Sequence, residues 1–296
     1  MNQGMIKHSI FIAVINCVPL NSKINMMKAI SSIVVLSLLL FFGCNEKKVK
    51  SVEVETETTT EIKDSTAYPE WVSLDYVMGK FKPEERADFT KIPEKYADRS
   101  GLYMRTEAYD SYLKMYEHAL KDGINLQIRS AARNFEYQKG IWERKWTGET
   151  KLSDGTDVSK DIQNHTDKAL KILEYSSMPG TSRHHWGTDI DLNAFNNKYF
   201  ESGEGKKVYD WLTTHAASYG YCQPYTPKNQ DRPRGYNEEK WHWSFMPLSV
   251  PLTKFAEENM QNKFIEGFQG ASTAPEIDVV SGYILGISKS CLENHK

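Results

Sequence analysis

Two short segments, well separated along the chain, constrain this sequence more than any other feature. The first is Ser182–Asp191 (SRHHWGTDID) and the second is Glu239–Trp243 (EKWHW). Together they supply imidazoles from two places, carboxylates that follow the first histidines, and a glutamate just before the last histidine. A catalytic zinc ion takes three protein ligands of these types and keeps a fourth position for water. The sequence therefore predicts a fold that brings both segments to one zinc ion.

The spacing within each segment narrows the choice of ligands. His184 and His185 are neighbours, whose side chains usually point apart, so we expect only one of them to bind metal. Asp189 and Asp191 fall on one face of an expected strand, and by that argument either could reach the ion. The alternative interpretation, exposed histidines beside a solvated acidic turn, leaves the joint occurrence of both segments unexplained.

The second segment supplies a base as well as a ligand. Glu239 and His242 are separated by two residues around a turn into a strand, so His242 can bind metal while Glu239 stands over the open position. Zinc lowers the pKa of its bound water, and a nearby glutamate can take the proton. Trp241 and Trp243 are expected to flank His242 and to wall the site from bulk water, and Trp243 is an expected substrate contact.

These motifs resemble a known family of zinc enzymes. The pattern Ser182-x-His184-x-x-Gly187-x-x-x-Asp191, followed by Glu239-x-x-His242-Trp243, is similar to the VanY-like D-alanyl-D-alanine carboxypeptidases, whose fold is shared with the hedgehog signalling domain. A third element of that family, SAARNFEYQ at 130–138, precedes them in the same order. The resemblance covers roughly residues 125–245.

The resemblance assigns a role to each residue of the site. It implies one Zn²⁺ per chain, held by His184, Asp191 and His242, with Glu239 as the catalytic base. It implies that Arg133 polarises the scissile carbonyl and stabilises the developing oxyanion. Gln138 and Ser182 are then expected to hold the peptide and its terminal carboxylate. The chain departs from the family in having Asp189 where alanine is common, and Ala132 where tyrosine often precedes the arginine.

Helical and strand patterns interleave at irregular spacing. Helices are expected at 106–122, 135–146, 169–175, 206–219 and 252–268, and strands at 126–129, 188–192 and 241–245. This order predicts an α+β fold with a small antiparallel sheet flanked by helices. The family resemblance implies that this fold is of the hedgehog and DD-peptidase type.

The resemblance implies a zinc carboxypeptidase that trims terminal D-amino acids from peptidoglycan stem peptides. The alternatives are a peptidoglycan endopeptidase, an L,D-carboxypeptidase of the same fold, and a non-catalytic zinc-binding module of the envelope. Glu239 and Arg133 argue against the module, since a structural zinc site is normally closed by four ligands. A formal charge of −2 and the lack of a basic block give no reason to expect nucleic acid as a partner, and the sequence identifies no protein partner.

The N-terminal region resembles a bacterial lipoprotein signal. A lysine at 28 precedes the apolar run 29–42, and Gly43 precedes Cys44. The run is shorter than the roughly 20 residues of a membrane span. We therefore expect 26–43 to be a signal peptide, Cys44 to be lipidated, and 1–25 to reflect a wrongly chosen start codon. The alternatives are an ordinary secretory signal and an uncleaved anchor.

The expected lipid anchor determines how we divide the rest of the chain. Residues 44–67 are polar and form an expected tether to an envelope membrane, on its periplasmic or surface side. The peptidase domain is expected at 68–291 and a tail at 292–296. Cys222 and Cys291 would then lie in an oxidising compartment, where they form either a disulfide or two buried thiols.

Overall fold

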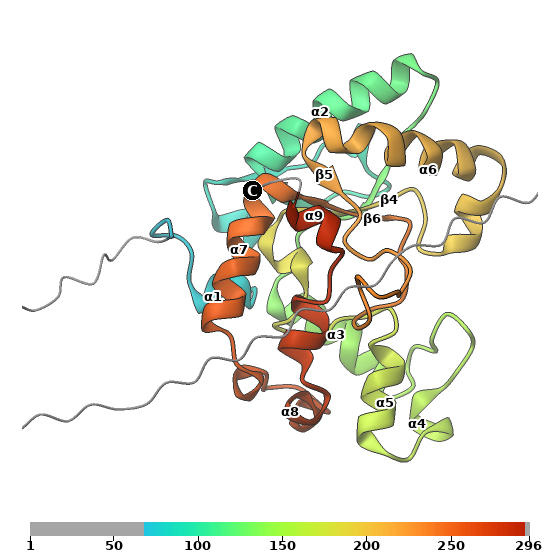
Figure 1. The fold of residues 1–296 in the computed structure, drawn as a ribbon. Coiled ribbons are helices and arrows are strands. Elements are labelled where there is room, and N and C mark those ends of the chain that lie inside the picture. The colour runs from blue at the N-terminus through green and yellow to red at the C-terminus, as the bar shows by residue number, and fades with distance from the viewer. Residues whose placement is uncertain (1–67, 294–296) are drawn as a thin grey trace, which may run out of the picture. The chain divides into compact units, whose positions relative to one another are not determined.

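A four-stranded antiparallel sheet carries both metal segments. The computed structural model describes residues 68–293, and within them the strands β3 (Ile128–Ser130), β4 (Asp189–Leu192), β5 (Tyr221–Cys222) and β6 (His242–Phe245) form a sheet in the order β3-β4-β6-β5. The strands β1 (Phe89–Lys91) and β2 (Tyr103–Arg105) form a separate antiparallel pair. Helices pack against the larger sheet, so the predicted α+β class is confirmed (Figure 1).

The register of the two central strands sets the two faces of the sheet. Asp191 lies opposite His242, and Asp189 lies opposite Ser244. Because side chains alternate along a strand, these four polar groups share one face, while Ile190 and its partner belong to the other. That other face is apolar and packs under two long helices, α2 (Thr106–Lys121) and α6 (Gly203–His215).

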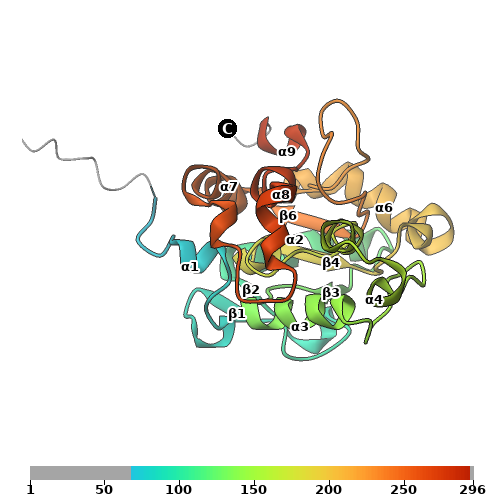
Figure 2. The ribbon, with the colours of Figure 1, turned by 90° about the horizontal axis from the view of Figure 1, so that it is seen from below.

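A second apolar cluster lies beside the polar face. Its helices are α3 (Phe135–Trp146), α5 (His165–Ile172) and α7 (Met246–Asn259), with the C-terminal segments that follow α7. Figure 2 places β3, β4 and β6 side by side, with α3 toward the β3 edge and α7 toward the β6 side. The short helices are α1 (Leu74–Val77), α4 (Val158–Asp161), α8 (Ala274–Ile277) and α9 (Lys289–Glu293).

Helix α3 begins and ends where the sequence predicts. The side chain of Asn134 caps it, because Asn134 Oδ1 accepts a hydrogen bond from the Tyr137 amide at 2.8 Å. Helix α2 also matches its prediction within one residue. The helix expected at 169–175 begins earlier, at His165, where Asn164 provides a similar cap.

The helix expected at 252–268 is misplaced in the prediction. Helix α7 begins at Met246 and ends at Asn259. Pro247 lies in its first turn, where the missing N–H would have no partner within the helix, so the proline marks the start of the helix and does not break it. Pro251 stands inside the helix, and the segment after Asn259 continues as a separate short turn at Asn262–Phe264.

A disulfide joins Cys222 to Cys291, with 5.7 Å between their Cα atoms. Of the two alternatives that the sequence leaves open, the structure has the disulfide. It ties α9 to β5, which is hydrogen-bonded to β6. A cross-link closing a loop of this length stabilises the folded chain by about 4 kcal/mol in the chain-entropy model.

The expected signal peptide, the expected lipidation site at Cys44 and the expected tether lie outside the described residues. Among residues 68–293, none of the helices combines the length and the apolar character that a membrane crossing requires.

Candidate metal centre

Three buried side chains meet at the polar face of the sheet. One ligand atom each from His184, Asp191 and His242 lies within 4.8 Å of the other two. Asp191 comes from β4 and His242 from β6, and His184 comes from the 3-10 turn Arg183–Trp186 just before β4. Gly187 ends that turn in a left-handed conformation, with φ of 71°, so the chain can reverse directly from the histidine into the strand.

The hydrogen bonds of the two imidazoles fix which nitrogen each ring presents. His184 Nδ1 donates to the Ala131 carbonyl at 2.9 Å, which leaves Nε2 at 3.3 Å from Asp191 Oδ2. His242 Nε2 lies 2.8 Å from Asp189 Oδ2, which leaves Nδ1 at 3.3 Å from Asp191 Oδ1. Each ring therefore has one nitrogen held by the protein and one directed at Asp191.

These separations fit a zinc ion. Ligand atoms at about 2.0–2.1 Å from zinc, in tetrahedral arrangement, lie about 3.3 Å apart. Within the described part of the chain, Asp191 Oδ1 is buried and has no hydrogen-bond partner. This is the state expected of a carboxylate oxygen that binds a cation. Two neutral imidazoles and one carboxylate are also donors that zinc prefers.

Asp189 is a support for His242, not a competing ligand. It accepts hydrogen bonds from Thr188 Oγ1 at 2.7 Å and from Ser244 Oγ at 2.6 Å, in addition to its contact with His242. Arg183 Nε lies 3.3 Å from its carboxylate. Burial alone would raise the pKa of Asp189, but Arg183 and His242 hold it well below its usual range. The carboxylate is therefore charged, and it fixes the orientation of the His242 ring.

His185 faces away from the cluster. Its Nε2 accepts from the Gly180 amide at 3.0 Å, and its Nδ1 donates to the Arg133 carbonyl at 2.6 Å. Gly79 packs against this ring so closely that a Cβ there would lie 2.4 Å from Nδ1. Both nitrogens are thus occupied by backbone groups, and His185 holds the main chain at Arg133 in place.

Glu239 stands beside the ligands at the wall of a cavity of about 680 Å³. Its Oε2 lies 3.2 Å from His242 Nδ1, the nitrogen that faces Asp191. Burial raises the pKa of Glu239 above its ordinary value. A carboxylate in this position can accept a proton from a group bound between the ligands.

The same cavity contains Arg133, whose guanidinium lies 3.1 Å from Ser130 Oγ and 3.9 Å from Asp191 Oδ2. Among the described residues, nothing accepts a hydrogen bond from its buried Nε. Gln138 also lines the cavity; its Nε2 donates to the Ser177 carbonyl at 2.8 Å, and its buried Oε1 has no donor in the described chain. Both side chains therefore keep hydrogen-bonding capacity for a ligand.

Two expected substrate contacts do not line the cavity. Ser182 is buried next to the turn that carries His184 and is not part of the cavity wall, although its Oγ has no hydrogen-bond partner in the described chain. Trp243 packs in the apolar cluster under α2 and α6, because alternation along β6 turns it to the face opposite His242. Trp241, just before the strand, belongs to the same apolar cluster and is the tryptophan of this segment that also lines the cavity.

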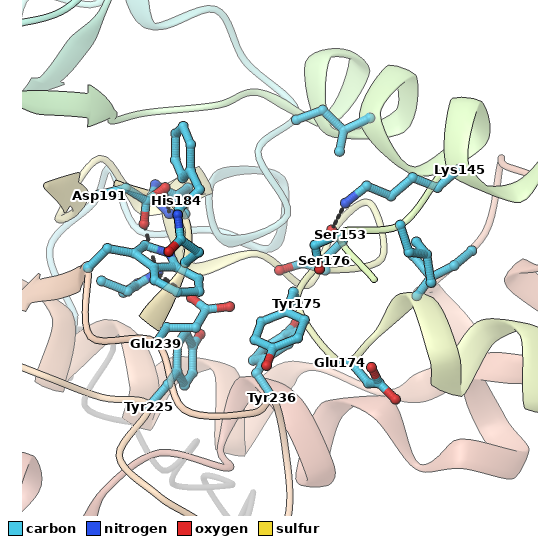
Figure 3. Close-up of a pocket in the computed structure, with 18 of the residues that line it drawn as sticks. Lys145, Ser153, Glu174, Tyr175, Ser176, His184, Asp191, Tyr225, Tyr236 and Glu239 are labelled. Carbon is cyan, nitrogen blue, oxygen red and sulfur yellow. Dashed lines mark hydrogen bonds and ion pairs between the residues drawn. The ribbon is translucent and has the colours of Figure 1, made fainter. Parts of the chain in front are cut away.

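The cavity also includes residues that the sequence analysis did not identify. Tyr225 stands next to Glu239, and its ring lies 4.7 Å from that of His242 and 4.9 Å from that of Tyr236 (Figure 3). At the other end of the cavity, Figure 3 shows Lys145 reaching toward Ser176. The sequence could have predicted that Lys145 lines the cavity, because its spacing from Gln138 and Ile141 puts all three on one helix face. No comparable pattern in the sequence identifies the two tyrosines.

Asp189→Asn should weaken zinc binding by about 10- to 100-fold, because the amide keeps the size of the side chain but loses the charge that orients His242. The dissociation constant is measured by competition with a chromophoric chelator. Asp157→Asn, at a buried aspartate far along the chain from this cluster, is the matched control. An unchanged dissociation constant in Asp189→Asn would show that the contact with His242 has no part in metal binding.

Comparison with known proteins places these residues in a family. A family model described as VanY, D-alanyl-D-alanine carboxypeptidase, matches residues 101–248, which is half of the chain. A D-alanyl-D-alanine carboxypeptidase of Enterococcus faecalis is 26% identical over 136 residues, or 46% of each protein. An uncharacterized protein of Haemophilus influenzae is 30% identical over 97 residues, which cover 32% of this chain and 65% of that protein.

The chain therefore spans less than two thirds of either curated relative. Among solved structures, VanYB in complex with D-alanine-D-alanine aligns with a TM-score of 0.41 at 18% identity, over 60% of this chain and 88% of that one. The match to the family model runs from β2 through β6 and includes Arg133, Glu239 and the three ligands. The chain belongs to the VanY family of D-alanyl-D-alanine carboxypeptidases.

Proposed function

We propose that this protein is a zinc-dependent carboxypeptidase that removes the C-terminal D-amino acid from peptidoglycan stem peptides. The observation that carries the proposal is the position of Glu239 and Arg133, which face the His184, Asp191 and His242 cluster from the wall of one cavity. The similarity to the D-alanyl-D-alanine carboxypeptidase of Enterococcus faecalis supports the choice of substrate. A cavity of about 680 Å³ is large enough for the end of a peptide.

Glu239 moves the protons of the reaction. When bound, zinc polarises a carbonyl and lowers the pKa of a coordinated water. Glu239 takes the proton of the attacking water, which its contact with His242 Nδ1 places within reach. The same carboxyl group then gives that proton to the leaving amine. The raised pKa of Glu239, which burial causes, suits a group that must be protonated for part of the cycle.

Arg133 stabilises negative charge at the scissile carbonyl and at the substrate's C-terminus. Its guanidinium offers several donors in a fixed plane, a geometry that matches oxyanions and carboxylates. The main chain around it is held on both sides, since its amide donates to the His184 carbonyl at 3.1 Å and its carbonyl accepts from His185. Gln138 Oε1 is placed to accept a substrate N–H.

Cleavage of cross-linked peptides and L,D-cleavage use the same residues and differ only in the substrate. A non-catalytic zinc module would need no buried glutamate beside the open side of the cluster. We further propose that the enzyme is attached to an envelope membrane through a lipidated Cys44, because the segment before this cysteine has the charge and apolar pattern of a lipoprotein signal.

Glu239→Gln should keep zinc and lose at least about 10²-fold in kcat, because the amide cannot accept the proton of the water. Metal content and turnover of a stem pentapeptide are measured on the same preparation. Glu238→Gln, the adjacent glutamate that the cavity wall does not include, is the control. Wild-type turnover in Glu239→Gln would remove this residue from the mechanism.

Blocking the substrate's C-terminal carboxylate as an amide should lower kcat/KM by about 10²-fold or more, because a buried charged partner is lost. Arg133→Lys should lower kcat/KM on the free acid as well, since an ammonium cannot form the bidentate contact. Product masses are compared for the acid, the amide and a cross-linked dimer. Equal rates on acid and amide, or a preference for the dimer, would favour the endopeptidase instead.

Cys44→Ser should move the protein from the membrane fraction to the soluble fraction or block its processing, because stable anchoring requires the acyl chains on this cysteine. Fractionation and intact mass are the measurements, and Ser51→Ala, in the expected tether, is the control. If Cys44→Ser keeps both the membrane fractionation and the mass of the wild-type protein, apart from the substitution itself, the lipid attachment is wrong.

A further inference from the structure

Helix α3 extends the cavity wall away from the metal cluster. Gln138, Ile141 and Lys145 all line the cavity, and their spacing of three and four residues puts them on one face of the helix. Two helical turns, or about 10 Å along the axis, separate Gln138 from Lys145. Lys145 therefore stands in the same cavity as Arg133, but further from the ligands (Figure 3).

Lys145 has no acidic partner among residues 68–293. Its Nζ donates to Ser176 Oγ, and it takes part in none of the ion pairs of the described chain. The other lysine of the cavity, Lys171, is 2.8 Å from Asp154 and 2.9 Å from Glu174 and is thereby neutralised. Of the two lysines in this cavity, only Lys145 keeps its charge free for a ligand.

The surroundings of Lys145 disfavour its charged form unless an anion binds beside it. Burial, and then the nearby Arg133, lower the pKa of Lys145 to about 8. The ammonium is still the main form at neutral pH, but this partly buried charge has no acidic side chain paired with it in the described chain. Glu239 attracts it, and Arg144 repels it. A carboxylate beside Ser176 would both accept its hydrogen bonds and remove the uncompensated charge.

We propose that Lys145 binds a second carboxylate of the substrate, carried by the side chain of a residue on the N-terminal side of the cleaved bond. The inference rests on the proposed carboxypeptidase activity, because the substrate then ends near Arg133, beside the metal cluster, and extends past Gln138 toward its own N-terminus. An extended peptide rises about 3.3 Å per residue, so the residue third from the C-terminus lies two steps, or about 7 Å, from the terminal residue, and a long side chain with a carboxylate at its end covers the rest of the distance to Lys145. The favoured substrate is a peptide with an acidic side chain at the third position from its C-terminus.

A matched pair of pentapeptides tests this inference. They differ only in the residue third from the C-terminus, which is lysine in one and diaminopimelate, a lysine with an added carboxylate on its ε carbon, in the other. The zinc-loaded wild type should prefer the diaminopimelate peptide by at least about tenfold in kcat/KM. Lys145→Met should remove this preference, mainly through KM, and leave the lysine peptide little changed.

Two further variants separate charge from structure. Lys139→Met, on the same helix but not on the cavity wall, should keep the preference. Lys145→Arg should retain most of it, because the positive charge remains. If Lys145→Met fails to fold, Lys145→Gln replaces it, and thermal melting identifies that case.

Binding is measured separately from cleavage, so the two proposals can fail independently. Calorimetry with zinc-loaded Glu239→Ala gives the dissociation constants of both peptides, and these should differ by about tenfold or more in favour of diaminopimelate. If the wild type cleaves neither peptide, the proposed function fails, while the ratio of dissociation constants still tests Lys145. Equal dissociation constants, or a preference that survives in Lys145→Met, would overturn the inference. If Lys145→Met instead changes only the preference for free-acid over C-terminal amide peptides, that result would also overturn the inference, because it would show that Lys145 binds the terminal carboxylate.

Discussion

The antiparallel pairing of β4 with β6 is the constraint on which the rest of the site depends. It sets Asp191 opposite His242 and Asp189 opposite Ser244, so that a ligand from each strand and the support for one of them share a face. A shift of one residue in this register would turn the polar set into the apolar core and bring Ile190 to the metal. The hydrophobic packing under α2 and α6 therefore fixes the metal geometry as well as the fold.

The polar side chains buried around the metal cluster need hydrogen-bond or ion-pair partners. Arg183 and Asp189 pair in the interior, and Arg183 also donates to Thr253 Oγ1 at 2.8 Å and to Ser244 Oγ at 3.1 Å. Of the six buried side-chain atoms without partners in the described chain, four belong to cavity residues (Asp191 Oδ1, Arg133 Nε, Gln138 Oε1 and the Tyr236 hydroxyl), and Ser182 Oγ and Arg232 Nε do not. Because buried polar atoms are normally hydrogen-bonded, this distribution marks where metal and substrate complete the structure.

Local signals in the sequence predicted local features well. The asparagine cap gave the start of α3, and alternation gave the common face of Asp189 and Asp191. Features that depend on tertiary distances were left open or misjudged: the pairing of Cys222 with Cys291, the role of Asp189, and the burial of Trp243. No spacing within the sequence reveals which side of a strand a cavity will lie on, or which distant serine a lysine will meet.

A crystal structure of the zinc-loaded protein, with anomalous scattering recorded at the zinc absorption edge, tests the central claim most directly. We predict one zinc ion per chain, bound by His184 Nε2, Asp191 and His242 Nδ1, with Asp189 hydrogen-bonded to His242 Nε2 and outside the coordination sphere. A zinc ion bound by Asp189 or His185, or one bound through His242 Nε2, would contradict it.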